Sequence, residues 1–228
     1  FPTTMAETVA LENDTVVARR RRTLGALVLE ETVLPRPPAD QAAALLAAEA
    51  IARDRLPWDE DSRNLQARLT RMRALEGEAW PDLSDAALAA DPAWLAEALH
   101  GATRMADVAK LDLSAALAAR LDWPMRQALD QALPARLKLP GGRSARIDYT
   151  QPTPTLSARA QDFFGLAATP RLANGRVALN AELLSPAGRP IAVTPDLKGF
   201  WQGGWAEVRK AMRGRYPKHA WPEQPDAD

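Results

Sequence analysis

The chain has 228 residues, of which 46% are hydrophobic and 25% are charged, and this composition is ordinary for a globular protein. Its 29 Lys and Arg residues balance 29 Asp and Glu residues, so any contact with a nucleic acid has to come from a local patch rather than from the net charge. The sequence has no cysteine, which excludes disulfides, thiolate zinc sites and cysteine nucleophiles.

The sequence shows no membrane or secretory segment. No apolar run approaches the roughly 18 residues that are needed to cross a bilayer. The first residues lack the basic and apolar stretches of a signal peptide. We therefore expect a cytoplasmic protein without a membrane partner. Because the sequence does not begin with Met, we also expect it to be a piece of a longer chain.

The first predicted elements are two strands within residues 14–34. One β-prone run begins at Val16, and residues 24–29 form another, with Gly25 as a bulge or a point of close approach. Residues 35–38, with the sequence Pro-Arg-Pro-Pro, are typical of a linker and end this β-rich segment.

Four consecutive arginines, Arg19, Arg20, Arg21 and Arg22, occupy the first of these runs. Alternate side chains of a strand point to opposite faces, so four arginines cannot all lie over a core. This pattern favours an edge strand that its charges protect against aggregation. In the alternative interpretation, the arginines contact a nucleic acid.

Residues 40–133 have the pattern of a run of short, alanine-rich helices. Start signals for these helices are the N-cap residues Asp40, Ser84 and Asp91, the last followed by Pro92, and Gly101 is a stop signal. The predicted helices cover residues 40–53, residues 59–75, a short segment from Ser84, a segment from Asp91 to Gly101, two segments within residues 103–121, and residues 124–133.

After Pro134 the pattern changes again. Alternating apolar and polar residues on both sides of Gly141–Gly142 predict a hairpin, and a second hairpin turns at residues 186–188. Between the hairpins, residues 154–166 are predicted to form a helix that Gly165 ends. Two short helices, separated by two glycines, close the chain.

Together these elements predict an α+β fold in three parts. Residues 1–38 are expected to form a short β-rich segment and its linker, and residues 39–134 a region of several helices. Residues 135–228 are expected to form an antiparallel α+β domain of two hairpins and short helices.

The motifs of several enzyme classes are absent from this sequence. It lacks the phosphate-binding loop GxxxxGK[ST] and the motifs HExxH, GxSxG and GxGxxG. Its two histidines, His100 and His219, do not have the spacing of metal ligands. We therefore predict no catalytic, cofactor-binding or metal-binding residue in this chain, and no small-molecule substrate.

The candidate site lies in the basic end of the chain, residues 208–220, where no carboxylate offsets the cations. Guanidinium groups suit bidentate contacts with phosphate, and Tyr216 and Trp221 are of the type that stacks on bases. In the other interpretation, the aromatic rings are buried, the prolines strap the tail across the domain, and only the residues beyond Trp221 are loose. Both interpretations can hold together. The candidates for nucleic-acid binding are Arg209, Lys210, Arg213, Arg215, Lys218 and Tyr216, together with Arg19, Arg20, Arg21 and Arg22.

Two long stretches near the end of the chain carry a family resemblance. Residues 183–201 and 205–223 resemble the closing signature of the HrpB family of bacterial ATP-dependent helicases. Shorter pieces upstream agree with the family in the same order along the chain. These pieces are residues 18–31, 56–69, 80–88 and 157–166.

HrpB proteins are similar to DEAH-type superfamily 2 RNA helicases, whose two RecA-like motor domains bind and hydrolyse ATP with Mg²⁺. The ATP-binding and DEAH-type residues of the family have no matching positions here, so this chain alone is not expected to be an enzyme or to bind a cofactor. The resemblance implies that residues 1–35 are the end of an oligonucleotide-binding-like β region, followed by a family-specific extension. The expected partners are RNA and the motor domains of the same full-length chain. The alternative function is a module that docks on the helicase core or on a protein partner without contacting RNA.

Overall fold

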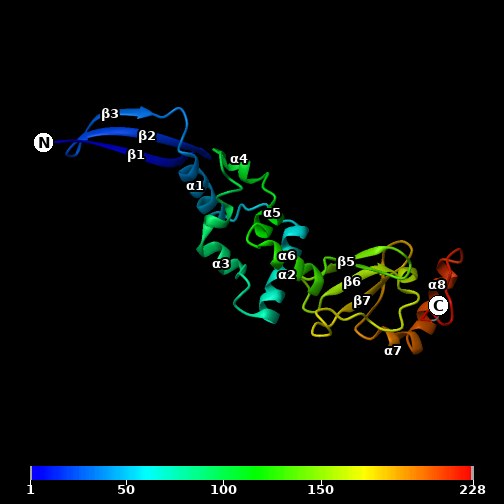
Figure 1. Ribbon diagram of the computed structural model, residues 1–228. Helices are drawn as coiled ribbons and strands as arrows, with labels where there is room; N and C mark the ends of the chain where they lie inside the picture. The colour runs from blue at the N-terminus through cyan, green and yellow to red at the C-terminus, as the bar shows by residue number, and fades with distance from the viewer. Residues whose placement is uncertain (1, 227–228) are drawn as a thin grey trace. The chain divides into compact units, whose positions relative to one another are not determined.

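The computed structural model describes residues 2–226, which divide into two compact units (Figure 1). Unit 1 combines the described residues up to Gln66 with Glu78–Leu121, and unit 2 combines Ala67–Gly77 with the described residues from Asp122 onward. Helix α2 (Glu60–Glu76) contributes to both units. The boundaries of the two compact units therefore differ from those of the three predicted parts, because residues of α2 belong to both units.

Unit 1 begins with an antiparallel sheet in the order β1-β2-β3, formed by β1 (Thr3–Glu12), β2 (Thr15–Leu24) and β3 (Leu27–Val33). Asn13 and Asp14 turn the chain between β1 and β2 with φ angles of 48° and 59°, which these two residue types tolerate. Strand β1 was not predicted. Gly25 (φ 58°) lies in the turn between β2 and β3, and the irregularity in the pairing lies between Arg22 and Thr23 instead.

Strand β2 is the middle strand of this sheet, so the prediction that the arginine-bearing strand lies at an edge is wrong. Both neighbouring strands place acidic residues opposite the arginines: Glu7 pairs with Arg20, and Glu31 pairs with Arg21. Oppositely charged cross-strand neighbours stabilise a sheet. The four arginines are therefore accommodated in a middle strand by acidic neighbours on both sides.

The predicted run of short helices forms the rest of unit 1. Ser84 and Asp112 cap two of these helices by accepting hydrogen bonds from the N–H groups of Ala87 and Ala115. The core of this unit contains fully buried leucines such as Leu46. The helices are α1 (Ala39–Ala52), the first turns of α2, α3 (Asp85–Ala90), α4 (Met105–Val108) and α5 (Leu113–Ala118).

The helix that was predicted from Asp91 to Gly101 is much shorter than expected. Only Pro92–Leu95 is helical, as a single 3₁₀ segment that Asp91 caps. The indole N–H of Trp94 donates to the carbonyl of Leu88 at 3.1 Å, which ties this turn back to α3. The chain then continues as turns up to Gly101, whose φ is 82°.

Unit 2 is built on a five-stranded sheet in the order β4-β5-β6-β7-β8. Its strands are β4 (Arg136–Lys138), β5 (Ser144–Asp148), β6 (Thr155–Arg159), β7 (Asn180–Leu184) and β8 (Pro190–Thr194). The two predicted hairpins are confirmed as β4–β5 and β7–β8. The predicted α+β fold is confirmed, with one difference: the sheet is mixed, because β6 and β7 run parallel while the other neighbouring strands run antiparallel.

The helix that was predicted over residues 154–166 is instead strand β6 followed by a 3₁₀ segment, Ala160–Phe163. Leu156 and Ala158 are buried while the residues on either side of them are less so, which is the alternation of a strand. The four-residue spacing from Leu156 to Ala160 resembled a helical face. Pairing with β7 decided the outcome, because it buries this strand inside the sheet.

The remaining helices of unit 2 agree with the sequence pattern. They are α6 (Trp123–Ala132), α7 (Leu197–Gln202) and α8 (Trp205–Arg215). Asp122 and Asp196 cap the first two by accepting backbone hydrogen bonds. None of the helices in the described part of the chain is long and apolar enough to cross a membrane.

A buried arginine ties α2 to the rest of unit 2. Arg68 is only 6% exposed, and its guanidinium donates to the carbonyl of Leu133 and pairs with Asp130. Nearby, the hydroxyl of the buried Tyr149 donates to the carbonyl of Pro134 at 2.7 Å. These side chains satisfy backbone carbonyls at the end of α6, where the helix leaves them without internal partners.

We predict that Arg68→Met destabilises the chain much more than Asp130→Asn. Arg68→Met leaves a buried carbonyl without its donor and should lower the free energy of unfolding by about 1–3 kcal/mol. Asp130 has a side chain that is 72% exposed, so losing its charge should cost less than about 1 kcal/mol. Urea unfolding followed by tryptophan fluorescence measures both. Equal losses would mean that the ion pair, and not the hydrogen bond to Leu133, holds α2.

Candidate nucleic-acid interface

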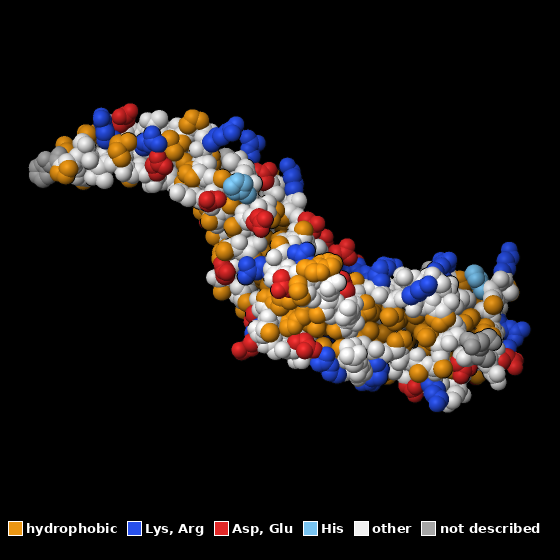
Figure 2. Space-filling model, in the orientation of Figure 1, with side chains coloured by type: hydrophobic (Ala, Val, Ile, Leu, Met, Phe, Trp, Pro, Cys, Tyr) orange, Lys and Arg blue, Asp and Glu red, His pale blue; other side chains and the backbone are white. Residues whose placement is uncertain are grey.

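The basic end of the chain folds as helix α8 and a tail that follows it. The helix stops at Tyr216 because Pro217 comes next, and a residue before proline is pushed out of helical conformation. Arg213 and Arg215 lie in the last turn, where cations interact favourably with the helix dipole. Figure 2 shows separate Lys and Arg side chains at the end of unit 2 that α8 and the tail form, with Asp and Glu side chains beside them.

The tail packs against the protein, which confirms the predicted strap. Trp221 is 6% exposed, and its indole N–H donates to the carbonyl of Tyr216 at 3.0 Å. The carbonyl of Pro222 accepts from the indole of Trp205 at 2.9 Å, and the carbonyl of Pro225 accepts from the backbone N–H of Gly165 at 2.7 Å. The expectation of a loose end beyond Trp221 is therefore wrong as far as Pro225. Residues 227 and 228 lie outside the described residues.

Trp221 belongs to an aromatic cluster centred on Trp205. Trp205 meets Trp201 edge-on with ring centroids 5.2 Å apart, Phe164 at 5.6 Å and Trp221 at 6.0 Å. Such tilted and edge-to-face pairs are favourable beyond the area that they bury. The ring of Trp221 is used inside the protein, so it is not available to stack on a base.

Arg209 also serves the tail. Its Nε donates to the carbonyl of Trp221 at 3.0 Å, and its guanidinium pairs with Glu223 at 2.8 Å. The side chain of Arg209 is only 22% exposed, whereas Arg213 is exposed. Glu223, the acidic partner of Arg209, lies outside residues 208–220, the stretch without carboxylates that defined the basic end.

Lys210, Arg213 and Lys218 are exposed and make no hydrogen bond or ion pair with any residue that the structure describes. Arg215 lies with its guanidinium carbon 6.0 Å from the ring centroid of Tyr216, and Tyr216 is half-buried. All six predicted residues in this segment are therefore at least partly accessible, and Arg209 is the one that pairs with a carboxylate of the described chain. Of the three carboxylates that could neutralise them, Asp196 caps α7 and Glu182 accepts from Ser157, whereas Glu207 of α8 makes no ion pair with a described residue.

The arginines of strand β2 belong to unit 1 and are neutralised within their own sheet. Arg19 pairs with Glu12 and with Glu31, and the hydrogen bond from Arg19 holds the pKa of the Glu12 carboxyl below its usual value. Figure 2 shows cationic and anionic side chains side by side over this sheet. The remaining pairs are Arg20–Glu7 at 2.7 Å, Arg21–Glu31 at 2.6 Å and Arg22–Glu30 at 3.6 Å.

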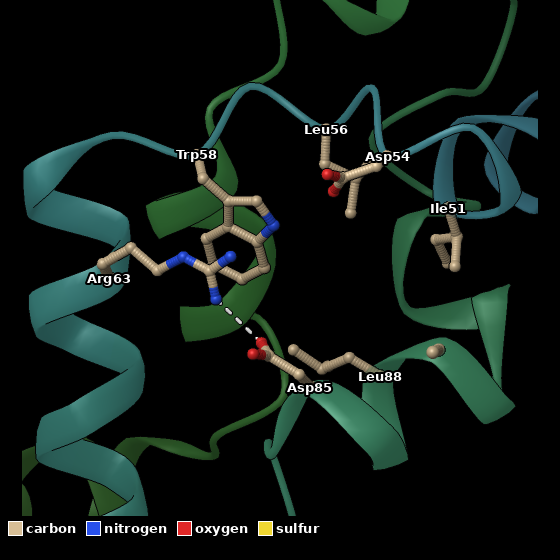
Figure 3. Close-up of a pocket in the computed structure, with 8 residues that line it drawn as sticks. Ile51, Asp54, Leu56, Trp58, Arg63, Asp85 and Leu88 are labelled. Carbon is tan, nitrogen blue, oxygen red and sulfur yellow. Dashed lines mark hydrogen bonds and ion pairs between the residues drawn. The ribbon is translucent and has the colours of Figure 1, made fainter.

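A pocket of about 220 Å³ in unit 1 was not predicted (Figure 3). Arg63 reaches from α2 across the ring of Trp58, with its guanidinium carbon 3.8 Å from the ring centroid, and pairs with Asp85 at 2.7 Å. The other walls are largely apolar and include Ile51 and Leu88. No local sequence pattern reveals the pocket, because these residues come together only when α1, α2 and α3 pack.

Hydrogen bonds fix the polar wall of this pocket. Gln66 donates to Asp85 at 2.9 Å and to the carbonyl of Leu83 at 2.8 Å. The bond from Gln66, followed by that from Arg63, holds the pKa of the Asp85 carboxyl below its usual value. The ion pair between Asp85 and Arg63 helps to keep the Arg63 guanidinium over Trp58. Within residues 2–226, no group of three or more His, Asp or Glu side chains is arranged to hold a metal ion.

Comparisons with known proteins show that most of the chain is similar to the C-terminal region of a helicase. The family model described as "ATP-dependent helicase C-terminal", HrpB_C, matches residues 94–225. The ATP-dependent RNA helicase HrpB of Escherichia coli (strain K12) is 39% identical over 216 residues, which are 92% of this chain and 27% of that protein. The chain therefore spans about a quarter of the length of this curated relative.

Solved structures agree with this similarity. The crystal structure of the E. coli DExH-box NTPase HrpB superimposes with a TM-score of 0.78 at 36% identity, over 99% of this chain and 29% of that one. A crystal structure described as the Escherichia coli DEAH/RHA helicase HrpB gives a TM-score of 0.71 at 34% identity, over 96% of this chain and 29% of that one.

We predict that Gln66→Met and Arg63→Gln each raise the pKa of the Asp85 carboxyl toward its ordinary value, because each removes a hydrogen bond that lowers this pKa. A lowered folded-state pKa adds stability that is present above the unfolded pKa of about 3.9 and is lost as the pH falls through the folded pKa. NMR titration of the carboxyl carbon measures each pKa. An unchanged pKa of Asp85 in Gln66→Met would contradict the assigned cause.

Proposed function

Because the chain belongs to the HrpB_C family of ATP-dependent helicase C-terminal regions, we propose that it is a non-catalytic accessory region that holds RNA near a helicase motor in the cytoplasm. The motor, with its ATP and Mg²⁺, would lie in the part of the helicase that this chain does not span. The name of the curated E. coli relative, an ATP-dependent RNA helicase, supports RNA as the nucleic acid.

The observation that carries this proposal is the set of exposed cations without partners around α8. Lys210 and Arg213 are three residues apart and share one face of the helix, and Lys218 follows in the tail. A cation without an acidic partner keeps its full attraction for a phosphate, and its binding releases counterions from the nucleic acid. The arginines of β2 give less support, because glutamates already neutralise them.

Tyr216 and Arg215 support a contact with single-stranded rather than duplex RNA. Tyr216 is half-buried and so keeps part of its ring accessible, beside the guanidinium of Arg215. Aromatic rings and guanidinium planes stack on unpaired bases, which a duplex hides. This places a base-stacking residue next to the cations that would follow the backbone.

A second candidate function is docking on the rest of the helicase, and the sheet of unit 1 favours it. Every residue of β3 is exposed, including four large apolar side chains. Leu27 is 67% exposed, Val28 51%, Leu29 47% and Val33 57%. An uncovered apolar strand of this length is typical of a protein–protein contact. RNA contact through α8 and docking through β3 use different units and are compatible.

We predict that the chain binds a fluorescein-labelled single-stranded oligouridylate and that Lys210→Ala/Arg213→Ala/Lys218→Ala weakens this binding. For single strands, the slope of log K against log salt is about −0.7 per neutralised phosphate, so losing three cations should reduce the slope by about 2. Fluorescence anisotropy between about 50 and about 200 mM salt measures the slope.

The matched control removes the same charges elsewhere: Lys110→Ala/Arg120→Ala/Lys198→Ala changes two lysines and one arginine that are exposed. This control should retain the affinity and the salt dependence of the unaltered chain. Equal effects of the two triple variants, or no binding at low salt, would reject the RNA role. The docking function would then stand alone.

A further inference from the structure

A groove of about 470 Å³ lies in unit 2 between α8 and the start of β8. Its lining is mainly apolar and includes Ile191 from β8 and Val208, Ala211 and Met212 from α8. The volume falls within the range of ~300–1,000 Å³ that is typical of ligand pockets. The groove is therefore large enough for one or two apolar side chains of a partner.

The groove and the cations Lys210 and Arg213 occupy different faces of α8, whereas Arg215 and Tyr216, which the proposed RNA contact also uses, line the groove. Val208, Ala211 and Met212 follow the three- and four-residue spacing of one helix face. Lys210 and Arg213 are absent from the groove lining and have the spacing of another face. A ligand of the groove therefore does not have to displace RNA from those two cations.

Charged side chains of both signs line the groove, so different parts of it favour different charges on a ligand. Arg189 and Arg215 both line it, and neither makes an ion pair with another residue in the described part of the chain. Glu207 also lines the groove and lies about two helical turns before Arg215 on α8. An anionic group is therefore favoured near the arginines and disfavoured near Glu207.

The neighbouring strand offers unpaired backbone groups. β8 is the last strand of its sheet, and among residues 2–226 it pairs with β7 alone. An open edge presents N–H and C=O groups to which an extended polypeptide can add as a new strand. Val193 of this strand is 57% exposed, so no described side chain covers it fully. A polypeptide can use such an edge, whereas RNA cannot form the ladder of backbone hydrogen bonds.

We propose that this groove docks an extended segment of a partner protein that carries an apolar residue followed closely by Asp or Glu. The apolar side chain fills the space between Ile191 and Met212, and the carboxylate pairs with Arg189 and Arg215. The partner's backbone runs along the edge of β8. This inference does not rest on the proposed RNA function, because its apolar anchor site lies away from Lys210 and Arg213; the two sites share Arg215 and Tyr216.

The test starts from the full 228-residue chain, immobilised and panned against a displayed library of random linear peptides. Enriched peptides should share an apolar residue followed within a few positions by Asp or Glu. One enriched peptide, synthesised with a fluorescent label, is then titrated against the chain and its variants. The same variants are titrated with the labelled oligouridylate.

Three variants separate the outcomes. Ala211→Trp fills the groove from an exposed helix position and should weaken peptide binding by about tenfold or more, as expected for the loss of an anchor pocket. Arg189→Glu/Arg215→Glu should weaken the binding of acidic peptides and strengthen the binding of basic peptides. Lys210→Glu/Arg213→Glu, the control on the other face, should leave peptide binding unchanged while it weakens RNA binding.

Two results would overturn the proposal. One is the absence of enriched peptides, or enrichment of peptides whose binding Ala211→Trp does not change. The other is that Ala211→Trp lowers the affinity for the oligouridylate as much as Lys210→Glu/Arg213→Glu does. The groove would then be part of the RNA site. If the chain fails to bind the oligouridylate but still binds the peptide through the groove, the RNA function is rejected and this inference stands.

Discussion

The burial of Trp205 is the contact on which the structure of the basic end of the chain depends. It is 1% exposed, it packs against the rings of Phe164, Trp201 and Trp221, and its indole N–H reaches the carbonyl of Pro222. One ring thereby joins α7, α8 and the tail. Because Trp205 is the first residue of α8, it sets the rotation of the helix about its own axis. That rotation determines which cations face water, which side chains line the groove, and that Arg209 is the cation that binds the tail.

Much of the fold can be predicted from local chemistry, and the failures have local causes. Capping residues such as Ser84 and Asp122 mark helix starts because their side chains accept backbone hydrogen bonds a few residues away. Strand β1 escapes notice because most of its residues are exposed, so no buried alternation marks it. β6 is mistaken for a helix because its pairing with β7 joins residues about 25 positions apart, as for Ser157 and Glu182.

The candidate site is predictable as a region but not residue by residue. A run without carboxylates marks the basic end, since that property is local. Whether each cation is free depends on partners that folding brings in: Glu223 for Arg209, and glutamates of the two flanking strands for the arginines of β2. The groove beside α8 is equally invisible, because β8 and α8 meet only in the folded chain.

The sheet of unit 1 carries its cations on the middle strand and its anions on the outer two. Glu31 alone serves both Arg19 and Arg21, whereas Arg20 has Glu7 to itself. A change at Glu31 therefore leaves Arg21 without its carboxylate while Arg19 keeps Glu12, and a change at Glu7 leaves Arg20 without its carboxylate. Over evolutionary time, the positions of this sheet should therefore change in linked groups: position 20 together with position 7, and positions 12, 19, 21 and 31 together.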